Sequence, residues 1–327
     1  MPRVLVTPHL LRRLPGPYTE VLQAAGMEVV YPPGEIDTVT PGALEPLLDG
    51  VDAILASTEL MSREILGRSR LRVIARMGVG YDAIDIPAAT DLGIVVAITP
   101  GILEESVAEH TIALMLGLSR DIVGRDREVR DCHWVRTPLP RMAGKTFGIV
   151  GLGRIGKALV PRLRGLGMQI IACDPCADAE YAAAQQVRLV SFEELLATAD
   201  VVSLHSPCTP QTRHLINAQT LAQMKPTAML INTARGPLVD EAALASALYA
   251  GHLLGAALDV FEVEPLSRQS PLQATPRTLL CSHMAGLDHE STIGMSRLAA
   301  QCIVDLHQGR WPESCIVNRD LAGKWRW

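Results

Sequence analysis

The sequence lacks the features of nucleic-acid-binding, secreted and membrane-spanning proteins. Its 30 basic and 35 acidic residues are interspersed, so it has no basic stripe for nucleic acid or an anionic membrane. The start, "MPRVLVTPHL", lacks the basic stretch and long apolar run of a signal peptide. The longest uncharged run, residues 242–258, is broken by "YAGHLLG" and is too short to cross a bilayer. We therefore expect a soluble protein with no nucleic-acid partner and no membrane partner.

The spacing of the cysteines does not predict a disulfide framework. The chain has seven, an odd number, and the one close pair is Cys173 and Cys176 in "CDPC". Because no second pair or nearby histidine completes a metal site, we attribute this spacing to chance and predict no bound metal. Cysteines without framework spacing indicate reduced thiols and a cytoplasmic location.

Short apolar runs alternate with helix-like segments almost from end to end. This alternation predicts an α/β protein with parallel sheets covered by helices on both faces. At 327 residues the chain exceeds the usual size of one domain, so two doubly wound units are expected. Strands are expected at residues 3–7, 27–31, 52–57, 72–77 and 93–98, and then at 146–151, 169–174, 187–190, 200–205, 228–233, 255–261 and 278–282. Ser191 and Asp240 are expected to cap the helices that follow them.

The two units are expected to be interleaved along the chain. Residues 107–118 are apolar on nearly every side, which is typical of a helix packed between domains or across a subunit boundary. The tail after His283 contains another long helix pattern and a strand-like "CIVN", and we expect it to return to the first unit. The predicted domains are residues 1–99 with 286–327, and residues 100–285.

A glycine-rich turn follows the first strand of the second series. Gly151, Gly153 and Gly156 have the G-x-G-x-x-G spacing, which allows backbone N–H groups to approach a pyrophosphate and the next helix to pack closely. The next strand ends at Asp174, where a carboxylate accepts hydrogen bonds from the ribose hydroxyls and repels a 2′-phosphate. The pattern predicts NAD rather than NADP. The first turn of the other unit has no glycine triplet, so one unit is expected to bind dinucleotide.

Three later strands end in polar residues at the edge where open α/β sheets bind ligands. Arg235 follows one strand, Asp259, Glu262 and Glu264 follow the next, and His283 follows the last. Arginine binds a carboxylate with two hydrogen bonds, histidine exchanges the hydroxyl proton, and a carboxylate orients that histidine and favours its charged form. Together they predict hydride transfer between NAD and a 2-oxo or 2-hydroxy acid.

Seven segments in order resemble the D-isomer-specific 2-hydroxyacid dehydrogenase family, and the resemblance covers almost the whole chain. They are "ARMGVGYDAIDIPAATDLGIVV", "SVAEHTIALML", "GIVGLGRIG", "HSPCTPQTRHLIN", "INTARGPLVDEAAL", "ALDVFEVEP" and "HMAG". The resemblance implies a Rossmann-type NAD domain, a discontinuous flavodoxin-like substrate domain, and an active site in the cleft between them.

The resemblance also implies roles for individual residues. Arg235 binds the substrate carboxylate, Glu264 is the catalytic glutamate, and His283 is the acid/base. Asp259 holds the nicotinamide carboxamide. The implied substrate contacts are Arg76, Val79, Gly80 and Arg235, and the implied cofactor contacts are Val107, Gly151, Gly153, Arg154, Ile155, Gly156, Asp174, His205, Pro207, Thr233, Ala234, Asp259, His283 and Gly286. We interpret His110, His205 and His289 as structural or surface residues, and we expect His205 to lie near the adenine.

Departures from subfamilies narrow the substrate. Formate dehydrogenases have glutamine where this chain has Glu264, and phosphite-oxidising members have lysine in place of Val79. Phosphoglycerate dehydrogenases commonly have arginine at the position of Ala56, so a phosphorylated substrate is not favoured, although Arg76 is retained. Ser282 replaces the proline usual before the histidine. The sequence does not rank the remaining 2-oxo acids.

Two alternative functions are weighed against hydride transfer. A protein that senses NAD on the same fold, as the family's corepressors do, retains the same three residues. A methyltransferase also has a glycine turn, but it has no use for an arginine, glutamate and histidine on later strands.

We predict a homodimer from residues 107–118 and the arm that follows them. Trp134 in that arm is interpreted as an aromatic anchor of the dimer interface, or alternatively as a wall of the partner's pocket.

Overall fold

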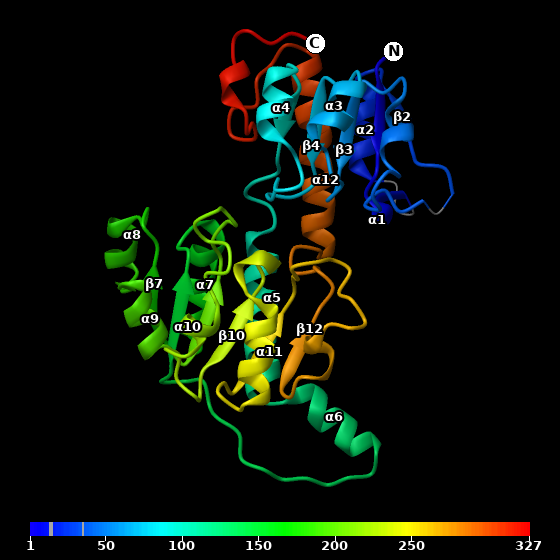
Figure 1. Cartoon of the computed structure of the whole chain (residues 1–327). Coiled ribbons are helices and arrows are strands. Elements are labelled where there is room, and N and C mark those ends of the chain that lie inside the picture. The colour runs from blue at the N-terminus through cyan, green and yellow to red at the C-terminus, as the bar shows by residue number, and fades with distance from the viewer. Residues whose placement is uncertain (13–15, 35) are drawn as a thin grey trace. The chain divides into compact units, whose positions relative to one another are not determined.

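The computed structural model describes residues 1–12, 16–34 and 36–327, which form two compact units (Figure 1). Unit 1 comprises Met1–Leu103 and Leu287–Trp327, and unit 2 comprises Glu104–Gly286. The boundaries expected from the sequence, 99/100 and 285/286, fall near these. Within the described residues, no helix is both long and apolar enough to span a bilayer.

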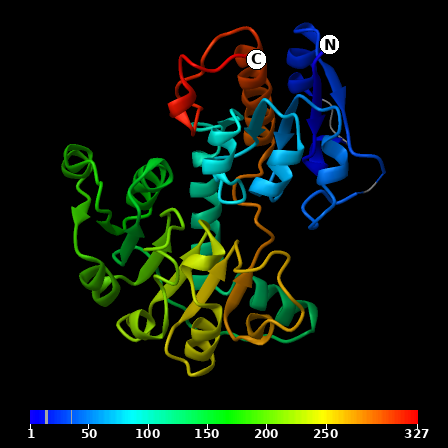
Figure 2. The same cartoon turned by 45° about the horizontal axis from the view of Figure 1, so that its top comes forward.

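Unit 1 contains a five-stranded parallel sheet in the order β2-β1-β3-β4-β5, which is the flavodoxin-like order. Its strands are β1 (Arg3–Val6), β2 (Glu28–Val30), β3 (Ala53–Ala56), β4 (Val73–Arg76) and β5 (Val95–Ala97). Its helices are α1 (His9–Arg12), α2 (Pro17–Ala24), η1 (Glu45–Leu48), α3 (Arg63–Arg68), α4 (Ile86–Asp91), α12 (His289–His307) and η4 (Arg319–Leu321). Leu66 of α3 and Ala88 of α4 pack in one core cluster with Ile54 and Ile74 of the sheet. Helix α12 packs on β3, β4 and α2, and both views show it beside the strands (Figure 2).

The C-terminal segment is fixed to the edge of this sheet. Ile316 forms a single antiparallel bridge with Ala97, so "CIVN" contributes one bridge rather than the expected strand. The Asn318 side chain explains this, because it accepts a hydrogen bond from the Val96 N–H (2.9 Å) and donates one to the Ile94 carbonyl (2.9 Å). A side chain therefore takes the place of further backbone pairing.

Unit 2 contains a seven-stranded parallel sheet in the order β12-β11-β10-β9-β6-β7-β8, the Rossmann order with one added strand. Its strands are β6 (Thr146–Val150), β7 (Gln169–Cys173), β8 (Arg188–Leu189), β9 (Val201–Leu204), β10 (Met229–Asn232), β11 (Gly255–Leu258) and β12 (Thr278–Leu280). Its helices are α5 (Glu104–Ser119), α6 (Ile122–Arg130), α7 (Arg154–Gly165), α8 (Ala179–Ala184), α9 (Phe192–Thr198), α10 (Ala218–Leu221), η2 (Gly236–Leu238), α11 (Glu241–Tyr249) and η3 (Pro271–Ala274). Both expected caps are confirmed, since Ser191 accepts from the Glu194 N–H and Asp240 from the Ala243 N–H.

Successive strand residues of unit 2 enter two separate cores. Ile149 packs with α5 and α7, whereas Val150 packs with α9, α10 and α11 on the other face. Leu114, Met115 and Leu118 of α5 lie in the first of these cores. The apolar side chains of this helix are therefore used within unit 2 itself, which explains its composition without a second subunit.

Candidate active site

Most of the site residues predicted from the sequence lie at one edge of the seven-stranded sheet. All seven strands are parallel, so their carboxyl ends meet there. After β6 come Gly151, Gly153, Arg154, Ile155 and Gly156, after β7 Asp174, after β9 His205 and Pro207, after β10 Thr233, Ala234 and Arg235, after β11 Asp259 and Glu264, and after β12 His283 and Gly286; Val107 lies on α5.

His283 and Glu264 form a hydrogen-bonded pair. The His283 Nδ1 lies 2.7 Å from Glu264 Oε2, and both side chains are partly exposed. The other oxygen, Glu264 Oε1, accepts the Phe261 N–H at 3.0 Å, so the carboxylate is held in place. Because Nδ1 is bound to the carboxylate, Nε2 is the ring atom left to exchange a proton with a substrate.

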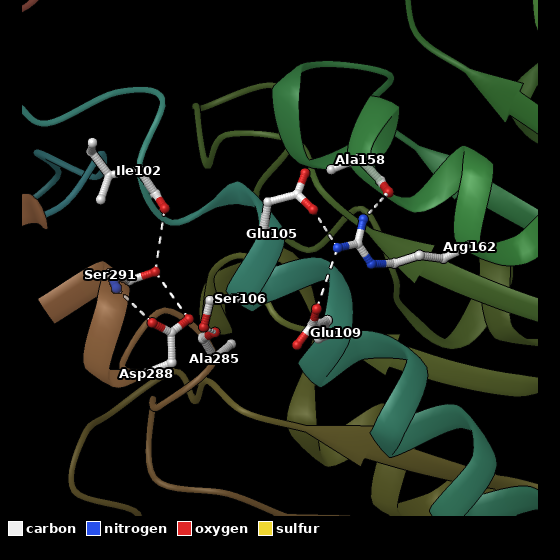
Figure 3. Close-up of polar contacts among 9 residues, drawn as sticks. All are labelled: Ile102, Glu105, Ser106, Glu109, Ala158, Arg162, Ala285, Asp288 and Ser291. Carbon is white, nitrogen blue, oxygen red and sulfur yellow. Dashed lines mark hydrogen bonds and ion pairs between the residues drawn. The ribbon is translucent and has the colours of Figure 1, made fainter.

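The loop that carries His283 is anchored to Asp259. This carboxylate is fully buried and accepts the N–H groups of Met284 and Ala285, each at 2.9 Å. The Asp259 carbonyl accepts the His283 N–H at 2.7 Å. From α5, the Ser106 hydroxyl donates to the Ala285 carbonyl at 2.8 Å (Figure 3). These bonds fix the backbone of His283, which has the left-handed φ of 55° that is uncommon outside glycine.

The turn after β10 places Arg235 beside the loop of Glu264. Asn232 shapes this turn, because its side chain donates to the Arg235 carbonyl (2.8 Å) and accepts the Ala234 N–H (3.0 Å). A methyl group on Gly236 would lie 1.8 Å from the Phe261 carbonyl carbon, so only glycine allows the two loops to meet. The Arg235 Nη1 donates to the Ala234 carbonyl at 2.5 Å. The arginine and the His283–Glu264 pair therefore lie on adjoining loops.

Glu262, the other acid of this loop, is engaged elsewhere. Its Oε1 accepts the Glu241 N–H at the start of α11 (3.1 Å) and lies 3.3 Å from the Nε2 of His214. The Glu262 N–H donates to the Glu241 side chain at 2.6 Å, and burial raises the pKa of that Glu241 carboxyl. Of the two acids, Glu264 is the one that contacts His283.

The glycine turn has the shape that a pyrophosphate requires. Gly151 has φ +99°, and a methyl group on it would lie 2.7 Å from the His205 carbonyl oxygen. A methyl group on Gly156 would lie 2.4 Å from the Gly151 carbonyl oxygen. At Gly153, by contrast, none of the described residues comes within 4 Å of an added methyl group, and this residue starts α7 without a side-chain cap. The open helix start leaves backbone N–H groups to bind an anion.

Polar atoms beside the turn also fit a dinucleotide. Asp174 accepts the Leu152 N–H at 2.8 Å and the Cys176 N–H at 2.7 Å, which places its carboxylate against the turn. Within the described part of the chain, His205 Nδ1 and Ser206 Oγ are buried and lack a hydrogen-bond partner. Burial lowers the pKa of His205, so the ring is neutral. Unpartnered buried polar atoms next to a glycine turn are consistent with a bound ligand.

Helix α7, which begins at this turn, is bonded to α5. Arg162 forms ion pairs with Glu105 and with Glu109 (3.4 Å to the latter), and its Nη1 donates to the Ala158 carbonyl at 2.9 Å (Figure 3). Because α5 also carries Ser106, one helix supports both the glycine turn and the loop of His283.

In unit 1, Arg76, Val79 and Gly80 lie at and just after the end of β4. The Arg76 Nη1 donates to the Met77 carbonyl at 2.9 Å. Gly78 has φ +143°, a backbone conformation that favours glycine, and the Arg76 guanidinium occupies the space beside it.

Comparison with known proteins places the chain in a family. The family model for the "D-isomer specific 2-hydroxyacid dehydrogenase, NAD binding domain" matches residues 112–285. A glyoxylate reductase of Thermofilum pendens is 38% identical over an alignment of 333 positions that covers 98% of this chain and 95% of that protein. The chain belongs to the D-isomer-specific 2-hydroxyacid dehydrogenase family.

Solved structures of similar proteins agree with this dehydrogenase fold. The TT0316 protein of Thermus thermophilus is 36% identical with a TM-score of 0.87, covering 96% of this chain and 100% of that one. The D-lactate dehydrogenase of Aquifex aeolicus, crystallised with NAD and lactic acid, is 26% identical with a TM-score of 0.85, covering 96% and 99%. This dehydrogenase is therefore an NAD-dependent oxidoreductase that transfers hydride at the C2 carbon of a 2-hydroxy or 2-oxo acid, and the predicted fold class and cofactor are confirmed.

Sequence reasoning gave no role to one residue of this dehydrogenase that lies next to the site. His110, interpreted as structural or surface, lies with its Nε2 3.5 Å from Asp259 Oδ1. The sequence did contain a signal that His110 lies near the loop of His283. Ser106 and His110 are spaced i, i+4 and therefore share one face of α5.

Proposed function

We propose that the chain reduces a small unphosphorylated 2-oxo acid to the D-2-hydroxy acid, with His283 as the proton donor. The 2.7 Å contact between His283 Nδ1 and Glu264 carries this proposal. A carboxylate in that position orients the ring and favours its charged form, which is the form that can donate a proton.

The residues have distinct tasks in the proposed reaction. Bound NADH supplies the hydride that the carbonyl carbon accepts. His283 Nε2 gives its proton to the carbonyl oxygen, which becomes the hydroxyl of the product, and Glu264 then faces a neutral ring. Arg235 holds the substrate carboxylate through two hydrogen bonds. In the reverse direction neutral His283 accepts the hydroxyl proton as the C2 hydride leaves.

The remaining contacts belong to the same proposal. Arg76, Val79 and Gly80 are assigned to the substrate, and this assignment rests on resemblance alone. The cofactor contacts have geometric support at the glycine turn, Asp174 and His205, as described above. The cofactor assignments supported by their place at the same edge are Arg154, Ile155, Pro207, Thr233, Ala234, Asp259, His283 and Gly286, whereas the assignment of Val107, on α5, rests on resemblance.

Glyoxylate is the substrate that we put first. The relative aligned over 98% of this chain is named glyoxylate reductase. Ala56 has no charge for a phosphate at the position where the phosphoglycerate enzymes commonly have arginine. Loss of NADH absorbance with glyoxylate, hydroxypyruvate, pyruvate, phenylpyruvate, 2-oxoisocaproate and phosphohydroxypyruvate tests the choice. We expect the highest kcat/KM with glyoxylate. Tight NADH binding without turnover of any of these acids would instead favour an NAD sensor.

We further propose a cytoplasmic homodimer that forms through α6 and the segment after it. Helix α6 buries none of its residues, Ile122 is 57% exposed, and Trp134 is 80% exposed. Figure 1 shows α6 and this segment extending away from the sheet of unit 2. An exposed apolar surface of this kind is typical of an interface. All seven cysteines are free thiols, which supports the location. Light scattering at micromolar concentration should give twice the 35.3 kDa chain mass, and a stable monomer would contradict the dimer.

A further inference from the structure

A second histidine lies behind the loop that carries His283. His110, on α5, is 20% exposed, and its Nε2 lies 3.5 Å from Oδ1 of the fully buried Asp259. Cys281 completes the group, since one ligand atom from each of the three residues lies within 4.8 Å of the others. All three residues belong to unit 2, on α5 and after β11 and β12.

The surroundings of His110 favour its charged form. The titratable groups that face it are Asp259 and then Cys281, and together they raise the pKa of His110 to about 9 against the opposing effect of burial. Its neighbour on α5, Glu109, pairs instead with Arg162. Below about pH 9 a buried carboxylate thus faces an imidazolium. The charge of Asp259 is balanced by this proton and by two amide N–H groups, so the cluster is explained without a metal ion.

The ion pair is connected to the reacting histidine through backbone. The Asp259 carboxylate that faces His110 is the same one that holds Met284 and Ala285, and the Asp259 carbonyl holds the His283 N–H. Loss of the charge on His110 leaves the Asp259 carboxylate buried without its cation, which destabilises the conformation in which this carboxylate holds the loop. The backbone of His283 has a left-handed φ, so it depends on these bonds to keep its conformation.

We propose that His110 is a positioning residue, whose ion pair with Asp259 holds the loop of His283 in its working conformation. This inference rests on the proposed role of His283 as the acid/base. It assigns His110 no contact with substrate.

The pH profile of 2-hydroxy acid oxidation tests the proposal in the NAD-loaded enzyme. In wild type the rate should fall as pH passes about 9, where His110 loses its proton. In His110→Gln the rate should be several-fold lower at neutral pH, and the alkaline fall should be absent. Cys281→Ala is the matched control, because it removes the thiol that also faces His110 and leaves the contact between His110 and Asp259 in place. It should keep the fall. If His110→Gln retains the fall, or if Cys281→Ala abolishes it, the proposal is wrong.

Two measurements on the protein without cofactor address the pair independently of turnover. In NMR, one histidine Cε1 signal should titrate near pH 9 and should be missing in His110→Gln. Because the pKa is raised in the folded state, the stabilisation is complete below the unfolded value of about 6.5 and is lost as pH rises through about 9. The Tm difference between wild type and His110→Gln should shrink over that window. The absence of any such signal, or a Tm difference independent of pH, would overturn the ion pair. If wild type turns over no 2-oxo or 2-hydroxy acid, the proposed function fails, while these two measurements still decide about His110.

Discussion

The first strands of the two units end in turns of opposite character. After β1, the Thr7 side chain is buried and donates to the Leu55 carbonyl at 3.2 Å, so the chain fills the turn with its own atoms. After β6, Gly151 and Gly156 bring backbone segments together, and Gly153 leaves open space at the start of α7. Both sheets are parallel and doubly wound. The comparison shows that strand order supplies a ligand-binding edge, whereas the residues of the turn decide whether a dinucleotide fits there.

The largest effect is expected from replacing His283, the proposed acid/base at the carboxyl edge of the sheet of unit 2. His283→Ala should lower kcat in both directions by about 10²- to 10⁴-fold, because it removes the proton donor and acceptor. NADH affinity, measured by fluorescence, should stay close to that of wild type. His252→Ala is the matched control, since His252 bonds to the Leu221 carbonyl and precedes β11 at the opposite edge of the same sheet. A similar loss of activity in both variants would mean that activity does not depend specifically on the histidine at the carboxyl edge of the sheet.

Arg235→Lys should be the next most damaging change. Lysine keeps the charge but lacks the planar pair of donors that matches a carboxylate, so kcat/KM should fall about 100-fold. The effect should fall on substrate KM and turnover, with the Kd for NADH unchanged. Steady-state kinetics of 2-oxo acid reduction measure it. Unaltered kinetics would remove Arg235 from substrate binding.

The open space at Gly153 can be tested without disturbing the fold. Gly153→Ala adds a methyl group that meets no atom of the described residues, so Tm should not change. If the pyrophosphate occupies that space, the Kd for NADH should rise about 10- to 100-fold, as overpacking of about 1–3 kcal/mol implies. Gly165→Ala, at the other end of α7 and also clear of described neighbours, should leave Kd unchanged. Equal Kd values for the two variants would contradict a bound cofactor at the turn.

The sequence predicted more of the fold than of the contacts behind the site. All twelve strands expected from apolar runs are found in the described residues, because strands of a sheet covered on both faces are continuously apolar. The edge that gathers Arg235, Glu264 and His283 also follows from strand ends alone. The pairing of His110 with Asp259 does not, because it depends on where α5 crosses the sheet, and helix periodicity carries no such information. For the same reason the apolar side chains of α5 suggested packing between domains or across a subunit boundary, whereas Leu114, Met115 and Leu118 pack in the core of their own unit.

Glu264→Gln distinguishes the two acids of one loop. Glutamine keeps the size and a hydrogen bond but removes the charge that favours imidazolium. The loss of reduction rate with rising pH should therefore begin at lower pH, and oxidation should extend to lower pH. Glu262→Gln should leave both profiles in place and instead lower Tm, because Glu262 bonds to the start of α11 and faces His214. The opposite pattern would make Glu262 the partner of His283.

The smallest effect concerns cofactor choice at Asp174. Its carboxylate accepts the Leu152 and Cys176 N–H groups, so it is fixed against the turn before any ligand binds. A fixed anion there accepts ribose hydroxyls and repels a 2′-phosphate. Asp174→Ala should weaken NADH by about tenfold through the lost charged hydrogen bonds, while NADPH binding should stay the same or improve. The preference for NADH, taken as the ratio of the two kcat/KM values, should therefore narrow. Asp178→Ala supplies the control, since that carboxylate caps α8 and pairs with Lys157 nearby without contacting the turn in any bond described. If wild type already prefers NADPH, the carboxylate at the end of β7 does not select NADH. The start of α7 cannot make that selection either, because NADH and NADPH have the same pyrophosphate.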